Sequence, residues 1–211
     1  MLNQILAVGL PLLAALPLAS DVANTTPPPP DRITIDVVTV NGSGCPQGTA
    51  AVAVSPDNTA FTVTYSQFLA QAGGGVPPTD MRKNCQLNLD VHVPQGFTYA
   101  IAQADYRGYA HLEAGASAVQ RANYYFQGMS QTAYRNHNFN GRLDDNWQTT
   151  DTTEVSALVY KPCGEQRNFN INAELRVNAG TGATATSFMA MDSTDGAIST
   201  KYHFAWKVCP P

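Results

Sequence analysis

The residues of this chain that could do chemistry are scattered, and no local motif brings them together. The sequence has no G-x-S-x-G nucleophile elbow, no phosphate-binding glycine loop and no H-E-x-x-H helix. The four histidines stand far apart, at His92, His111, His137 and His203. Asp144 and Asp145 are adjacent carboxylates, but neighbours on a strand point to opposite faces, so this pair alone makes no glycosidase site. We therefore predict no catalytic residue, no metal and no cofactor.

The segment from Asn136 to Gly141 (NHNFNG) comes nearest to a metal motif. Oxygen-bearing residues stand at its first, third and fifth positions before a glycine, as at the start of an EF-hand calcium loop. The twelfth position is Trp147, where such a loop needs a bidentate glutamate, and neutral amides attract a hard cation poorly. We interpret the segment as a polar hairpin loop; the alternative is a weak calcium site completed by Asp144 or Asp145.

Aromatic and cationic side chains are the remaining candidates for binding. Exposed tyrosine and tryptophan rings can stack on sugars, and we select Tyr106, Tyr109, Tyr134 and Trp147 as candidate ligand-binding residues. The alternative is that these rings fill the core. Arg82 and Lys83 form either a small cationic spot for an acidic or sugar ligand or ordinary surface positions, with Asp80 as a salt-bridge partner.

The cysteines indicate an oxidising compartment. An even number of them, Cys45, Cys85, Cys163 and Cys209, follows an apolar amino-terminal segment, and no C-x₂-C pair suggests zinc. Of the three possible connectivities we favour Cys45–Cys85 and Cys163–Cys209, because sequential pairs close the shorter loops.

The amino terminus is typical of a secreted protein. Residues 5–18 are almost wholly apolar but too short for a span of about 20 residues, and small residues follow at Ala19 and Ser20. We predict a signal peptide at residues 1–20, with a buried helix or strand as the alternative. Residues 21–31 carry four consecutive prolines and are expected to form an exposed leader. Asn24 and Asn41 stand in glycosylation sequons.

Beyond Arg32 the dominant pattern has the period of two residues that strands show. We predict strands at residues 33–40, 49–54, 60–65, 87–93, 97–112, 124–126, 155–160, 169–177, 184–191 and 202–208, and around Tyr134. Gly108 is expected to mark a bulge or a close approach. About ten such strands favour a single antiparallel β-sandwich over residues 32–211, of jelly-roll or immunoglobulin-like type with two disulfides.

The composition narrows the range of partners. Only 13% of the 211 residues are charged, 44% are hydrophobic and the net charge is −4. There is no excess of basic residues for nucleic acid, and no later apolar run could span a membrane. The solvent-facing strand positions carry mostly hydroxyls and amides, which suits extracellular polysaccharide or glycoprotein.

Three stretches together resemble a known family: residues 42–46 (GSGCP) with 52–59 (VAVSPDNT), residues 80–87 (DMRKNCQL), and residues 106–110 (YRGYA). Their order and spacing are similar to an uncharacterised family of small secreted fungal and bacterial proteins, domain of unknown function number forty-three sixty. The resemblance covers residues 38–209. It implies a secreted β-rich domain with disulfides at these cysteines, and it implies no activity.

These observations favour a non-enzymatic binding module at a cell wall, matrix or host surface, with glycans as candidate ligands. The alternatives are an extracellular hydrolase whose site is assembled from distant strands, and a structural coat or matrix protein.

Overall fold

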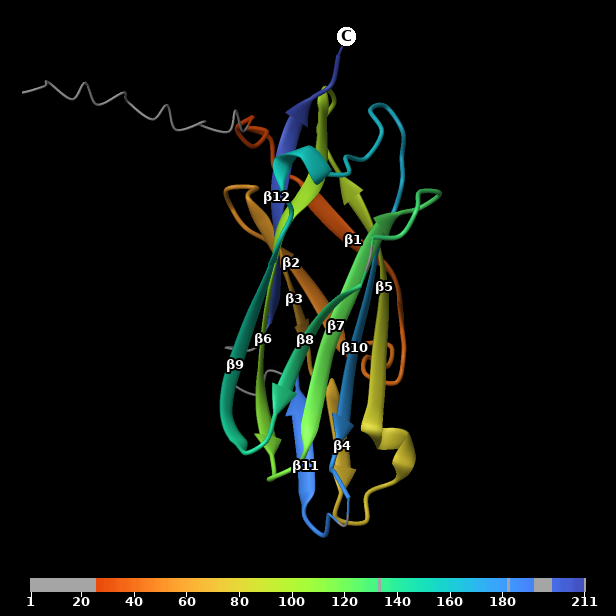
Figure 1. The fold of residues 1–211 in the computed structure, drawn as a ribbon. Helices are drawn as coiled ribbons and strands as arrows, with labels where there is room; N and C mark the ends of the chain where they lie inside the picture. The colour runs from red at the N-terminus through yellow and green to blue at the C-terminus, as the bar shows by residue number, and fades with distance from the viewer. Residues whose placement is uncertain (1–25, 133, 182, 192–198, 211) are drawn as a thin grey trace, which may run out of the picture.

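The computed structural model describes residues 26–132, 134–181, 183–191 and 199–210, which form two facing antiparallel sheets (Figure 1). The five-stranded sheet has the order β1-β5-β10-β7-β8, and the seven-stranded sheet has the order β2-β3-β12-β6-β11-β4, with β9 paired to β6. The strands are β1 (Thr34–Asn41), β2 (Ala50–Val54), β3 (Ala60–Tyr65), β4 (Leu69–Gly73), β5 (Arg82–His92), β6 (Phe97–Leu112), β7 (Ser117–Phe126), β8 (Arg135–Asn140), β9 (Leu143–Thr152), β10 (Phe169–Asn178), β11 (Thr186–Ala190) and β12 (Thr200–Val208). The predicted β-sandwich is confirmed.

Alternate residues of the inner strands build the core between the sheets. Phe61 on β3 meets Phe169 on β10 edge-to-face, with ring centroids 6.3 Å apart, and Tyr99 on β6 meets Phe126 on β7 at 5.2 Å. Both pairs join the two sheets. Each such side chain contributes about 1.5–3 kcal/mol by leaving water, so the aromatic core is a main source of the sandwich's stability.

Strand β6 is the central strand of the larger sheet, because it pairs with three other strands. It pairs with β12 from Phe97 to Tyr106, with β9 from Gln103 to Leu112, and with β11 near its end. Gly108 is buried at this crowded point, where a Cβ would lie 2.1 Å from the backbone oxygen of Ala190. The close approach expected at Gly108 is therefore confirmed.

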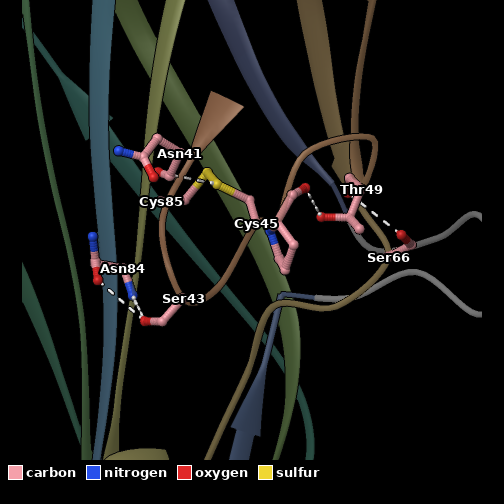
Figure 2. Close-up of a disulfide and its surroundings, with 8 residues drawn as sticks. Asn41, Ser43, Cys45, Thr49, Ser66, Asn84 and Cys85 are labelled. Carbon is pink, nitrogen blue, oxygen red and sulfur yellow. Dashed lines mark hydrogen bonds between the residues drawn. A yellow bond between two sulfur atoms is a disulfide. The ribbon is translucent and has the colours of Figure 1, made fainter. Parts of the chain in front are cut away.

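Both favoured disulfides are present. Cys45–Cys85 ties the loop after β1 to β5, and Figure 2 shows Ser43 of that loop bonded to Asn84, the neighbour of Cys85. Cys163–Cys209 ties the loop before β10 to the end of β12, at the end of the sandwich that carries the carboxyl terminus. The Cα atoms are 5.3 and 5.8 Å apart, within the usual range for disulfides.

The strand prediction is wrong at residues 155–160. This segment begins with a short 3₁₀ helix, Val155–Ala157, and continues as irregular chain along β6. Val155 and Val159 are exposed, so β-forming residue types alone do not make a strand where no partner buries them. The supposed hairpin loop at Asn136 is also wrong, because these residues form β8, paired to β7. Strands β4 and β9 add two further elements that the sequence pattern does not indicate.

The described part of the proline-rich leader is held against the domain. Asn58, which is buried and has a positive φ, donates hydrogen bonds to the carbonyl oxygens of Pro29 (3.0 Å) and Asp31 (2.8 Å). Its Oδ1 accepts a bond from the amide of Ile33 at 3.2 Å. Pro29 is buried, so residues 26–31 form a strap on the sandwich rather than a free spacer.

Candidate ligand-binding surface

The outward-facing residues of β6 build the most chemically varied face of the protein. Because side chains alternate along a strand, the odd-numbered residues of β6 from Gln103 to His111, past the register shift between Ile101 and Gln103, point away from the core that the even-numbered ones fill. Strand β9 contributes Asp144 opposite His111 and Asn146 opposite Tyr109. Strand β11, on the other side, places Phe188 opposite His111. Three strands distant in sequence thus converge near the β4–β11 end of the sandwich (Figure 1).

Tyr109, His111 and Phe188 form what we call the aromatic patch. The rings of His111 and Phe188 lie 5.6 Å apart with planes 24° from parallel, and those of Tyr109 and Phe188 lie 6.0 Å apart at 31°. All three side chains are half-buried, so they present a contiguous apolar surface that still reaches solvent. Neighbouring aromatic rings that reach solvent can pack against the apolar face of a ligand.

Hydrogen bonds to carboxylates fix the patch. Tyr109 donates its hydroxyl to Asp144, and His111 contacts Asp144 at 3.1 Å through Nδ1 and Glu113 at 3.4 Å through Nε2. The hydrogen bond to Asp144 is the main cause that raises the pKa of His111. The same contacts, that of Tyr109 first, lower the pKa of Asp144, which is therefore ionised at neutral pH.

A second polar group lies further along the same face. His203 contacts Asp105 at 2.7 Å, and Thr150 and Gln103 also donate hydrogen bonds to that carboxylate. Burial alone would raise the pKa of Asp105, but the bonds from Thr150, His203 and Gln103 outweigh it and lower the pKa. The face is therefore continuous in hydrogen-bonding side chains from the aromatic patch to β12.

The four aromatic residues selected from the sequence are not brought together. Tyr106 and Trp147 are buried in the core, as the alternative interpretation held. Tyr109 belongs to the aromatic patch, and Tyr134 lies on the opposite sheet, with the Arg121 guanidinium 3.9 Å from its ring centre. Phe188 and His111 are not among the binding residues selected from the sequence. Their contact depends on the register of β11 against β6, which the sequence does not show.

The remaining predicted positions are separate from the patch. Asn41 is exposed at the end of β1, whereas Asn24 lies outside the described residues. Lys83 pairs with Asp80 at 2.7 Å, and Arg82 does not share that pair. Within the part of the chain that the structure describes, no group of three or more His, Cys, Asp or Glu side chains is arranged to hold a metal ion.

A cavity of about 620 Å³ opens beside the second disulfide. Its walls include His92, Phe97, Lys161, Arg167, Cys163 and Cys209. The charged groups are already engaged: Arg167 pairs with Glu165 at 2.6 Å, and Lys161 donates to the backbone oxygen of Glu165 at 2.5 Å. The cavity therefore exposes the Cys163–Cys209 bond to solutes more than it offers free charge to a ligand.

Fold and disulfides together define a disulfide-bonded β-sandwich domain. The family model "Domain of unknown function (DUF4360)" matches residues 31–209, and the chain belongs to this family. It is 36% identical over 192 residues to an "Uncharacterized secreted protein" of Arthroderma benhamiae, covering 91% of this chain and 78% of that one. The relative and the disulfides agree with an extracellular location.

One solved structure is a remote match. The enzymatically active domain of tailspike protein 4 of bacteriophage CBA120 shares 10% identity and a TM-score of 0.26, over 84% of this chain and 19% of that chain. So weak a likeness says nothing about the activity of this protein. No helix in the described ranges is long and apolar enough to cross a membrane.

Proposed function

We propose that the protein is a non-catalytic binding module that holds a neutral glycan of a cell wall, matrix or host surface. The observation that supports this is the aromatic patch: three half-buried rings, with Phe188 stacked on His111 at 24° and tilted by 31° from Tyr109, on a face otherwise rich in hydroxyls and amides. The CH-bearing face of a pyranose ring packs on such rings much as another aromatic ring does. The amide of Asn146, opposite Tyr109 on β9, can bond sugar hydroxyls in this proposal.

The charge beside the patch favours an uncharged ligand. Asp144 is ionised and largely exposed, so it can accept hydrogen bonds from sugar hydroxyls. The same negative charge, with that of Glu113 nearby, repels uronic acids and sulfated sugars. Neutral hexose polymers such as cellulose, β-1,3-glucan, chitin and mannan therefore fit this face best.

The test is a depletion assay on these four insoluble polysaccharides. The variant Tyr109→Ala/Phe188→Ala removes the two hydrocarbon rings, each worth about 0.5–1.5 kcal/mol, so we expect about a tenfold loss of affinity for the bound polymer. Tyr134→Ala is the matched control, since it removes an exposed tyrosine from the other sheet.

The control variant should bind like the unmodified protein. Binding to none of the four polymers, or equal losses in the two variants, would contradict the proposal. Release of soluble sugar from a bound polymer would contradict the non-catalytic part of it.

A further inference from the structure

The outer face of the five-stranded sheet carries a concentration of positive charge around one buried carboxylate. The even-numbered residues near the end of β10 point outward and include Glu174 and Arg176. Arg82 on β5 lies directly opposite Arg176, and Arg121 on β7 lies directly opposite Glu174. We call these four residues the Glu174 cluster. It lies on the opposite sheet from the aromatic patch and is independent of it.

Glu174 hydrogen-bonds two of the three arginines and lies close to the third. Arg82 donates from Nε to its Oε2 at 2.6 Å, Arg176 donates to its Oε1, and the Arg121 Nε lies 3.7 Å from Oε1. Only 6% of the Glu174 side chain is exposed. Burial alone would raise the pKa of Glu174, but the bonds from Arg82 and Arg176 lower it, so the carboxylate is ionised.

The cluster has more positive charge than its carboxylate can neutralise. Three guanidinium groups meet one carboxylate, which leaves a net charge of about +2 in a chain whose overall charge is −4. A carboxylate has about four acceptor sites, whereas three guanidinium groups carry about fifteen N–H donors. The nearby Lys83 and Asp80 pair with each other and add no net charge.

The excess donors face solvent. The side chains of Arg82 and Arg176 are 59% and 48% exposed, although they are directly opposite each other on neighbouring strands. Like charges in that position destabilise a sheet, and the Glu174 carboxylate that bonds both arginines neutralises only one of the two charges. A further anion between the two side chains would neutralise the other and recover free energy. The Arg121 side chain is less exposed, at 26%, and its guanidinium lies 3.9 Å from the centre of the Tyr134 ring.

The surroundings of the cluster fit a sugar rather than a bare ion. The outward positions next to Glu174 on the same face belong to Asn84 and Asn172, and Asn172 donates to Asn123 at 3.1 Å. These amides continue the polar surface along β5, β10 and β7. A ligand that carries an acidic group and several hydroxyls can therefore use both the arginines and the amides.

We propose that the Glu174 cluster is a binding site for the carboxylate or sulfate group of an acidic polysaccharide. Arg82 and Arg176 supply the planar forks that match such oxyanions in bidentate fashion. Glu174 is a positioning residue, because it aligns the guanidinium groups and does not itself face the ligand. The protein then has two unlike faces, one for neutral and one for acidic glycans.

The test measures binding of the full secreted protein to polygalacturonate and to dextran sulfate, with neutral dextran as the blank. Polygalacturonate reports a carboxylate ligand and dextran sulfate a sulfate ligand. We expect Arg82→Gln/Arg176→Gln to lose about tenfold in affinity for the polymer that binds. The matched control is Arg107→Gln/Lys201→Gln, which removes the same charge from the exposed face of the other sheet and should lose about twofold or less.

Three outcomes would overturn the proposal: binding to neither acidic polymer, equal losses in the two double variants, or binding of inorganic phosphate alone. A thermal melt of each variant confirms that it is folded. If Arg82→Gln/Arg176→Gln does not fold, Arg176→Gln alone is tested, because it keeps the Arg82–Glu174 bond. This single variant should still lose about threefold in affinity for the acidic polymer. An unchanged affinity would refute the site.

Discussion

The two disulfides differ in their access to solvent, and this difference predicts an order of reduction. Cys45 and Cys85 are 0% and 2% exposed, in the core beneath the loop that follows β1. Cys163 is exposed and Cys209 half-buried, and both line the 620 Å³ cavity. Because thiol–disulfide exchange needs the attacking thiolate to reach a sulfur atom, a mild reductant should open Cys163–Cys209 in the folded protein. Cys45–Cys85 should open only when the sandwich unfolds.

The loop lengths also give the loss of stability expected when either disulfide is reduced. The two bonds close loops of similar length, with sequence separations of 40 and 46 residues. The chain-entropy model gives each a stabilisation of about 4 kcal/mol. For a domain of this size, each kcal/mol of lost stability lowers the melting temperature by about 2–4 °C. Loss of one disulfide should therefore lower the melting temperature by roughly 8–16 °C.

The assay combines native reduction with trapping of free thiols and peptide mass mapping. We expect labelling first at Cys163 and Cys209, in a protein that keeps its sandwich but melts at the lower temperature. As the matched comparison, Cys163→Ala/Cys209→Ala should reproduce that melting temperature. Cys45→Ala/Cys85→Ala should cost more, because it also removes two buried sulfur atoms from the core. Labelling of Cys45 and Cys85 at the same rate or earlier would show that burial does not protect the Cys45–Cys85 bond from reduction.

Three further predictions concern stability and titration. Gly108→Ala should lower the free energy of unfolding, measured with denaturant, by about 3 kcal/mol, because its Cβ would meet a backbone oxygen at 2.1 Å. In Gly96→Ala the Cβ meets open space, so this variant should lose only the ~1–2 kcal/mol that a left-handed backbone costs. Equal losses in the two variants would contradict the close approach at Gly108. His111 should titrate by NMR above its ordinary pKa of 6.5, and Asp144→Asn should bring it back toward 6.5. Because the pKa of His111 is raised in the folded protein, its contribution to stability is fully present below pH 6.5 and is lost as the pH rises through the folded-state pKa. Asp144→Asn should therefore make the free energy of unfolding depend less on pH in this range. Asn58→Asp keeps the oxygen that accepts a hydrogen bond but loses the two N–H groups that bond the carbonyls of Pro29 and Asp31. The free energy of unfolding should fall by roughly 3 kcal/mol. An unchanged unfolding midpoint would show that Asn58 does not hold the strap.

Much of the fold follows from side-chain alternation and loop length. The alternating stretch of Leu87, Leu89 and Val91 folds as a half-buried strand, and the favoured disulfide pairing is the one the protein has. Alternation also separates Tyr106 from Tyr109, because residues three apart on a strand face opposite sides. One of them therefore lies in the core and the other on the surface.

Edge strands and strand register are not visible in the sequence. Strands β8 and β9 are rich in Asn, Asp and Thr and carry few apolar residues, so they lack the pattern that reveals a half-buried strand. The contact of Phe188 with His111 depends on the pairing of β11 with β6, and the Glu174 cluster depends on three strands meeting in one register. Such long-range pairings decide which polar residues become neighbours.

The most direct test of the proposed function is chemical-shift mapping by NMR with neutral hexasaccharides of cellulose, β-1,3-glucan, chitin and mannan. We expect one of them to shift the resonances of Tyr109, His111 and Phe188 in a saturable manner, while the resonances of residues in the five-stranded sheet stay unchanged. Saturable shifts that map elsewhere, or none with any of the four oligosaccharides, would contradict the proposed function.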